Sequence, residues 1–259
     1  MPDVRYGRLH SQSATALALA AQELARSGAE FILLPGDVTD ASRSEELKAA
    51  AKALQTVKLP DYAVPGNHDR LQDPKLAALW QQYFGAPARL EKHAGVQLLA
   101  LDTGDGKLNQ PANRAAIEAL DPALPVIVFT HYQLAPDDQI KDDDKAISDA
   151  AESAVLLDKL KAMNGFVFVG HKNVATTARL GRMTQLNAPQ LTQFPAGYLV
   201  ADLYDDGLLL RFVPALDEFF DEYGRLRSGR YKQTAKLRDR RSLELWNAFY
   251  PADFSAARP

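Results

Sequence analysis

The chain alternates between short apolar runs and stretches with a helical pattern. The apolar runs are rich in β-branched and aromatic residues, which is typical of strands buried on both faces of a mostly parallel sheet. The stretches between them predict amphipathic helices. Together these patterns predict an α/β fold. The predicted strands are 31–35, 62–64, 96–103, 126–129 and 166–169, and the predicted helices are 15–25, 44–54, 74–84, 112–120 and 147–163.

The pattern changes after residue 173. Short apolar runs follow one another there, with Gly and Pro between them. The sequence Asp205-Asp206-Gly207 separates the last two runs and is a hairpin turn signal, so these runs predict an antiparallel end to the sheet system. The runs are 174–180, 183–187, 198–203 and 208–213.

The last segment, from Asp217 on, differs in its charge. It contains eight Lys and Arg residues between 225 and 241, and the aromatic residues Trp246, Phe249 and Tyr250 follow. We therefore divide the chain into a main domain, 1–216, and a basic and aromatic C-terminal extension, 217–259, packed on that domain or at an interface. The basic run is either a docking surface for an anionic partner or a neighbouring subunit, or a solvated helix anchored by its aromatic residues.

Composition narrows the class of protein. A chain of 259 residues with 46% hydrophobic residues can bury one large core or two small ones. Its net charge of −3 gives no argument for nucleic-acid binding. It contains no cysteine, which excludes disulfides and thiolate metal sites. It has no apolar stretch of transmembrane length and no visible signal peptide.

Polar residues with metal-binding side chains follow the predicted strands. Asp37 follows the first strand, and the sequence Gly66-Asn67-His68-Asp69 follows the second. His131 and His171 follow the strands 126–129 and 166–169. Residues just beyond the carboxyl ends of parallel strands converge on one crevice, so we expect these side chains to form a metal site.

The order GD, GNHD, H and GH at this spacing resembles the calcineurin-like metallophosphoesterases over most of the chain. The resemblance implies a four-layer α/β/β/α sandwich of two mixed sheets flanked by helices. It also implies hydrolysis of a phosphate ester with divalent metal ions. Asp37 would bridge two metals, and Asn67, His131 and His171 would complete the ligands of one. Nitrogen and oxygen ligands of this kind suit Mn, Fe or Zn.

The resemblance also implies roles for the remaining residues of GNHD. His68 would orient the phosphate and protonate the leaving oxygen, and Asp69 would be the orienting partner of His68. Asp3 would bind the second metal.

Two positions depart from the family pattern, which opens with Asp-x-His and closes with Gly-His-x-His. Arg5 and Asn173 stand where the family has histidine. An arginine stays protonated and cannot bind a metal, but its planar guanidinium suits a phosphate oxygen, so Arg5 is a candidate catalytic residue. Three arrangements stay open: one metal with Arg5 in place of the second; two metals, with Asn173 or His10 as substitute ligands; and no physiological metal.

The function that we expect is metal-dependent hydrolysis of a phosphate mono- or diester of a small molecule. The stretch 28–70 looks most like the branch that includes cyclic-nucleotide phosphodiesterases. The alternative is a degenerate member that binds a phosphate-containing ligand or a partner with little or no catalysis. Only two residues precede Asp3, where the family has a buried strand. We therefore expect either a truncated start or an upstream segment, which could have carried an export signal. The compartment stays open: the cytoplasm, or export if an upstream segment is missing.

Overall fold

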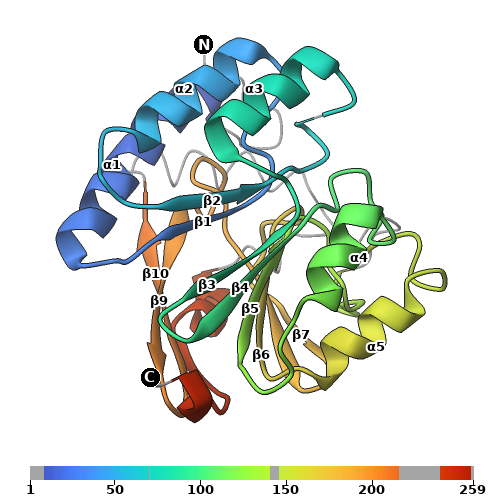
Figure 1. The fold of residues 1–259 in the computed structure, drawn as a ribbon. Helices are drawn as coiled ribbons and strands as arrows, with labels where there is room; N and C mark the ends of the chain where they lie inside the picture. The colour runs from blue at the N-terminus through green and yellow to red at the C-terminus, as the bar shows by residue number, and fades with distance from the viewer. Residues whose placement is uncertain (1–8, 70, 141–145, 216–239, 258–259) are drawn as a thin grey trace.

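A six-stranded mixed sheet lies at the centre of the fold (Figure 1). The computed structural model describes residues 9–69, 71–140, 146–215 and 240–257. The four inner strands of the sheet are parallel, and β3 and β7 pair antiparallel at its two edges. The order is β3 (Arg89–His93), β4 (Val96–Leu101), β5 (Val126–Thr130), β6 (Gly165–Val169), β8 (Met183–Asn187) and β7 (Thr177–Leu180). Every residue of the inner strands is buried, because both faces of the sheet are covered.

A second layer of strands covers one face of this sheet. It consists of a parallel pair and an antiparallel three-stranded sheet in the order β11-β10-β9. Phe129 and Phe166 of the central sheet share a core with Leu208 and Leu210 of the second layer. The strands are β1 (Ile32–Pro35), β2 (Asp61–Val64), β9 (Gly197–Tyr204), β10 (Gly207–Pro214) and β11 (Ala248–Pro251).

Helices cover the two outer surfaces. One group packs on the free face of the central sheet, where Leu156 and Leu160 meet Val128 and Val167. The other group packs on β1 and β2 through Leu47 and Trp80, among others. The first group is α4 (Pro111–Glu118) and α5 (Ala154–Ala162); the second is α1 (Ser13–Ser27), α2 (Ser44–Leu54) and α3 (Pro74–Phe84). The predicted α/β/β/α sandwich is therefore confirmed (Figure 1).

The predicted helix 147–163 is too long at its start, since α5 begins at Ala154. The preceding residues are held by bonds to other segments instead of a helix. Ile147 N donates to Gln133 O, and the Asp149 carboxylate accepts the backbone N–H groups of Leu108 and Asn109. Tertiary hydrogen bonds thus override the helical pattern at this point.

Two strands were not predicted. β3 has the mostly polar sequence RLEKH and lies at an edge, where partial exposure removes the apolar signal. β11 lies in the C-terminal segment and pairs with β10. Just before it, in the 3-10 helix Arg240–Trp246, the Trp246 side chain is buried and its Nε1 donates to Asn187 O. The domain boundary proposed at 217 and most of the basic run lie outside the described residues.

Two further 3-10 helices, His10–Gln12 and Ser255–Ala257, complete the described elements. Among the described helices, none is long and apolar enough to cross a membrane.

Candidate metal centre

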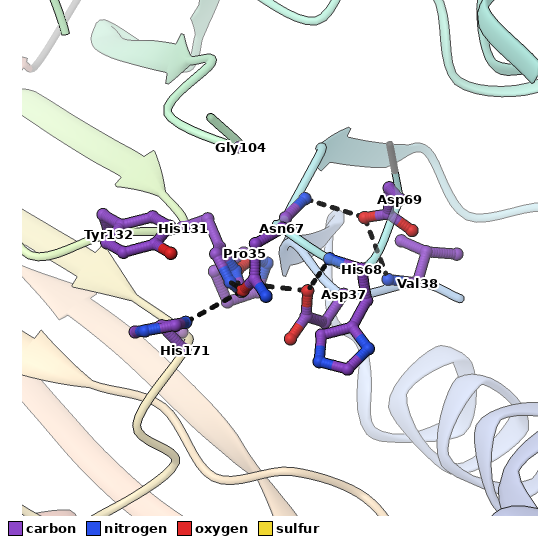
Figure 2. A network of polar contacts seen from close by, with 12 residues as sticks. Pro35, Asp37, Val38, Asn67, His68, Asp69, Gly104, His131, Tyr132 and His171 are labelled. Carbon is purple, nitrogen blue, oxygen red and sulfur yellow. Dashed lines mark hydrogen bonds and ion pairs between the residues drawn. The ribbon is translucent and has the colours of Figure 1, made fainter. Parts of the chain in front are cut away.

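Four strand ends bring the predicted site residues together (Figure 2). Asp37 follows β1, and Asn67 follows β2. His131 and His171 follow β5 and β6 of the central sheet. The parallel pairs β1–β2 and β5–β6 end at the same edge of the fold, so residues far apart in sequence become neighbours.

The amide oxygen of Asn67 lies at the centre of this group. Asn67 Oδ1 is 3.0 Å from His131 Nε2 and 3.0 Å from His171 Nδ1. His131 Nε2 is also 3.4 Å from Asp37 Oδ1. Two imidazole nitrogens, one amide oxygen and one carboxylate oxygen therefore face one another.

The contact of the other His131 nitrogen, Nδ1, determines which ring nitrogen carries the hydrogen. His131 Nδ1 is 3.0 Å from Pro35 O, and a carbonyl oxygen only accepts, so Nδ1 carries a hydrogen. In a neutral imidazole Nε2 then has a lone pair, and this lone pair faces the oxygens of Asn67 and Asp37. The arrangement is electron-rich and buried, because the His131 side chain is 0% exposed. A cation at this place would stabilise such a group of acceptors.

Three glycines surround the His131 ring and explain part of the GD, GN and GH pattern. A Cβ added at Gly36 would lie 2.4 Å from His131 Nδ1, and one at Gly66 would lie 2.3 Å from Asp37 Oδ1 and 2.7 Å from His131 Cε1. A Cβ at Gly170 would lie 2.4 Å from Pro35 O. Since these approaches are shorter than real Cβ contacts, only glycine lets the three loops meet around the imidazole.

Three site residues have a left-handed backbone conformation, which residues other than glycine seldom adopt. The φ angles are 54° at Asp37, 62° at His171 and 53° at Asn173. Such a conformation costs free energy and persists only where surrounding contacts hold it. At Asn173 one such contact is local, since its Nδ2 donates to His171 O at 3.2 Å.

Asp69 holds the loops of the site in place. Its fully buried carboxylate accepts the backbone N–H groups of Val38, Thr39 and Gly66 and the hydroxyl of Thr39. Burial raises the pKa of Asp69 to about 6, although hydrogen bonds from Gly66 and Thr39 oppose the shift. This carboxylate ties the loop after β1 to the loop after β2, and so fixes Asp37 beside Asn67.

The expected pairing of Asp69 with the His68 ring is replaced by a pairing with Asp40. His68 Nδ1 lies 2.6 Å from Asp40 O and 3.6 Å from Asp40 Oδ1. Both oxygens of Asp69 are directed to the backbone of the two loops, so its geometry serves the loops and not the imidazole. Asp40 Oδ2 is also 3.8 Å from His10 Nε2.

Sequence reasoning missed two residues of this site. Asp40 follows Asp37 after two residues, and the pattern G-D-x-x-D was its available signal. Tyr132 directly follows His131, and its ring stacks on His171 with centroids 4.1 Å apart and an interplanar angle of 28°. No spacing rule in the sequence pointed to this stack. Asp3 and Arg5, which were expected to complete the site, lie outside the described residues.

Within the described segments, no three His, Cys, Asp or Glu side chains lie close enough to hold a metal ion on their own. Asp37, His131 and His171 form a donor set only together with the amide of Asn67. An amide oxygen is a metal ligand of ordinary kind for a hard divalent ion, so Asn67 decides whether the set is complete.

The candidate site residues lie within a part of the chain that matches a known protein family. A family model described as calcineurin-like phosphoesterase matches residues 9–174. Among solved structures, GAP50, the anchor in the inner membrane complex of Plasmodium, has a TM-score of 0.54 and 15% identity, over 79% of this chain and 80% of that one. At this identity the likeness shows the fold alone.

Phosphopantetheinyl hydrolase from Mycobacterium tuberculosis has a TM-score of 0.45 and 15% identity, over 62% of this chain and 78% of that one. A predicted phosphoesterase from Streptococcus pneumoniae has a TM-score of 0.37 and 14% identity, over 79% of this chain and 85% of that one. No curated protein matches the chain significantly.

Proposed function

Because the chain belongs to the calcineurin-like phosphoesterase family, we propose that it hydrolyses a phosphate mono- or diester at a divalent metal ion. Asp37, Asn67, His131 and His171 would hold this ion, which for the family is Mn, Fe or Zn. The observation that carries the proposal is the electron-rich group around Asn67 Oδ1, where the lone pair of His131 Nε2 faces two oxygens.

The distances between the donor atoms fit an ion at this place. Metal–ligand bonds of about 2.1 Å separate neighbouring donors by about 3.0 Å in an octahedral site and about 3.4 Å in a tetrahedral one. Asn67 Oδ1 lies 3.0 Å from His131 Nε2 and 3.0 Å from His171 Nδ1, and His131 Nε2 lies 3.4 Å from Asp37 Oδ1. These three separations support the proposal of a divalent metal at this place.

A bound metal of this kind would supply a hydroxide nucleophile at neutral pH and offset the charge of the phosphate. The side chains of the protein would supply the proton that the leaving oxygen needs. His68 Nδ1 faces a carbonyl oxygen and so carries a hydrogen, which leaves Nε2 to exchange a proton with the leaving oxygen.

We favour one complete metal site, with Arg5 in place of a second ion. Arg5 cannot bind a metal, whereas its guanidinium suits a phosphate oxygen beside Asp37. The alternative is a member of the family that binds a phosphate-containing ligand or a partner without hydrolysing it. The two candidates make different predictions for turnover of an activated ester.

The test is metal content and hydrolysis of an aryl phosphodiester by the same preparations. We expect about one tightly bound transition metal per chain after dialysis, and turnover that depends on it. His131→Ala should abolish both. His93→Ala is the matched control, because His93 pairs with Glu30 on the surface, at the end of β3.

Metal binding without turnover would favour the non-hydrolytic alternative. Two metals per chain, both lost in His131→Ala, would contradict the single-site proposal. Full activity in His131→Ala would contradict the assignment of the site.

A further inference from the structure

Trp246 links the C-terminal segment, drawn in red in Figure 1, to the central sheet. It lies outside residues 9–174, which match the family model. Its side chain is buried, and its ring stacks on Phe212 of β10 with centroids 5.4 Å apart. Its Nε1 donates a hydrogen bond to Asn187 O at 2.6 Å. Because both residues are buried, this bond fixes the backbone of Asn187 as well as the indole ring.

Asn187 is the last residue of β8, and each of its polar groups has a partner. Its side-chain Oδ1 accepts a hydrogen bond from Gln133 Nε2 at 2.5 Å, and its Nδ2 donates to Thr176 Oγ1 at 2.6 Å. Its backbone N donates to Thr176 O at 3.2 Å. Together with the bond from Trp246, these contacts make Asn187 the point at which three other segments of the chain meet.

The two side-chain partners of Asn187 belong to the loops that carry the site histidines. Gln133 follows His131 after one residue, and its side chain is 0% exposed. Thr176 lies at the end of the loop that begins with His171 and is buried as well. Asn187 therefore lies between the two loops and holds one side chain of each.

The loop at His171 depends on contacts of this kind. The φ angles of His171 and Asn173 are 62° and 53°, and such a left-handed conformation persists only where surrounding contacts hold it. At the start of the loop, Gln133 Nε2 faces Gly170 O at 3.5 Å. At its end, Thr176 is bonded to β8. Loss of these contacts would let the loop relax and move the imidazole of His171.

We propose that Asn187 and Trp246 are positioning residues for the candidate metal centre. Trp246 fixes Asn187, and Asn187 holds the loops of both site histidines. In this position His131 and His171 each place a ring nitrogen 3.0 Å from Asn67 Oδ1. Loss of a residue that orients metal ligands from outside lowers metal affinity by about 10–100-fold. The inference rests on the proposed function only in that the two histidines bind a metal.

The first test compares two changes of tryptophan to phenylalanine in the metal-free full chain. Trp246→Phe keeps an aromatic ring against Phe212 but removes the N–H that fixes β8. Trp80→Phe is the matched control, because Trp80 is equally buried and its Nε1 has no hydrogen-bond partner in the described part of the chain. In NMR spectra of protein labelled at histidine, the imidazole signals of His131 and His171 should shift in Trp246→Phe. They should keep their positions in Trp80→Phe.

The second test separates positioning from stability. Gln133→Met removes the amide at nearly the same side-chain length and should weaken Zn²⁺ binding by about tenfold or more. Gln97→Met is the matched control, since Gln97 is also 0% exposed. Its amide bonds to the backbone of Asp121 and Leu124, near the amino end of β4 and away from the site. Both variants should lose stability in urea, whereas only Gln133→Met should lose affinity for Zn²⁺.

Histidine signals that keep their positions in Trp246→Phe would overturn the proposal. An equal loss of Zn²⁺ affinity in the two glutamine variants would also overturn it, because the loss would then follow stability alone. The first test needs no metal. If the wild type binds no Zn²⁺ but the histidine signals shift in Trp246→Phe only, the proposed function fails and the coupling of Trp246 to the two histidines stands.

Discussion

β1 connects two regions that differ sharply in how well their groups are partnered. At its carboxyl end the chain enters the candidate metal centre, where Asp69 alone accepts four hydrogen bonds from two loops. Along its outer edge the same strand lines, together with β9, a groove of about 1030 Å³, and it has no strand partner on that side among the described residues. The first region is held by many hydrogen bonds between loops, whereas the second is less closely packed.

The first prediction compares packing in the closed core with packing at the groove. Phe166→Ala should lower the free energy of unfolding by about 3–5 kcal/mol, because Phe166 is 0% exposed and stacks on Phe254. Leu199→Ala on β9 should cost at most about half as much, since the groove already leaves Leu199 partly uncovered. Urea denaturation measures both. Equal costs would show that the groove is filled in solution.

The second prediction concerns the glycines that surround His131. Gly66→Ala should weaken Mn²⁺ binding by about 100-fold, because the added methyl would lie 2.3 Å from Asp37 Oδ1. Gly28→Ala is the control: its φ is 85° and its ψ is 20°, but no atom lies within 4 Å of the added group. The control should lose about 1 kcal/mol of stability and keep its metal affinity. Unchanged metal binding in Gly66→Ala would mean that the site is not where we place it.

The third prediction follows from the raised pKa of Asp69, from an ordinary 3.8 to about 6 in the folded protein. Between these values the folded state binds more protons than the unfolded state, so this group makes stability fall as the pH rises from about 4 to about 6. Above that range its penalty is constant. Asp69→Asn should remove this fall, seen as a flatter dependence of unfolding free energy on pH. A wild-type stability that rises through this window relative to the variant would contradict the assignment.

The smallest expected effect is at Tyr132. Tyr132→Ala removes the ring that stacks on His171 and should weaken metal binding several-fold, as the loss of about 0.5–1.5 kcal/mol implies. Tyr132→Phe keeps the stack and should match the wild type. Metal titration of the two variants separates the ring from its hydroxyl. An equal loss in both would point to the hydroxyl instead.

Most residues of the candidate metal centre could be located from the sequence, because they follow strands with a strong apolar signal. Asp37, Asn67, His131 and His171 were each located by the run before them, and parallel pairing brings those runs to one edge. Whether they bind a metal stays a prediction. The helices 44–54 and 74–84 were predicted with the boundaries of α2 and α3.

The misses have physical reasons of their own. The apolar–polar alternation is weak in β3 because it is a polar edge strand. The start of α5 was predicted too early because the Asp149 carboxylate accepts a backbone N–H group of another loop. The partner of His68 was assigned to Asp69, its neighbour in sequence, whereas Asp40 is its neighbour in space. Long-range contacts of this kind leave no periodic trace in a single sequence. The groove lies between β1 and β9, which do not pair with each other in the described part of the chain. A local sequence pattern does not indicate which distant strands pair.

X-ray absorption of the Zn²⁺-loaded protein tests the metal centre most directly. The account predicts a first shell of nitrogen and oxygen donors at about 2.0–2.2 Å, with the outer-shell scattering of two imidazoles. In His171→Ala the spectrum should show one imidazole fewer. A wild-type spectrum without histidine scattering, or one unchanged by His171→Ala, would contradict the claim that His131 and His171 hold the ion.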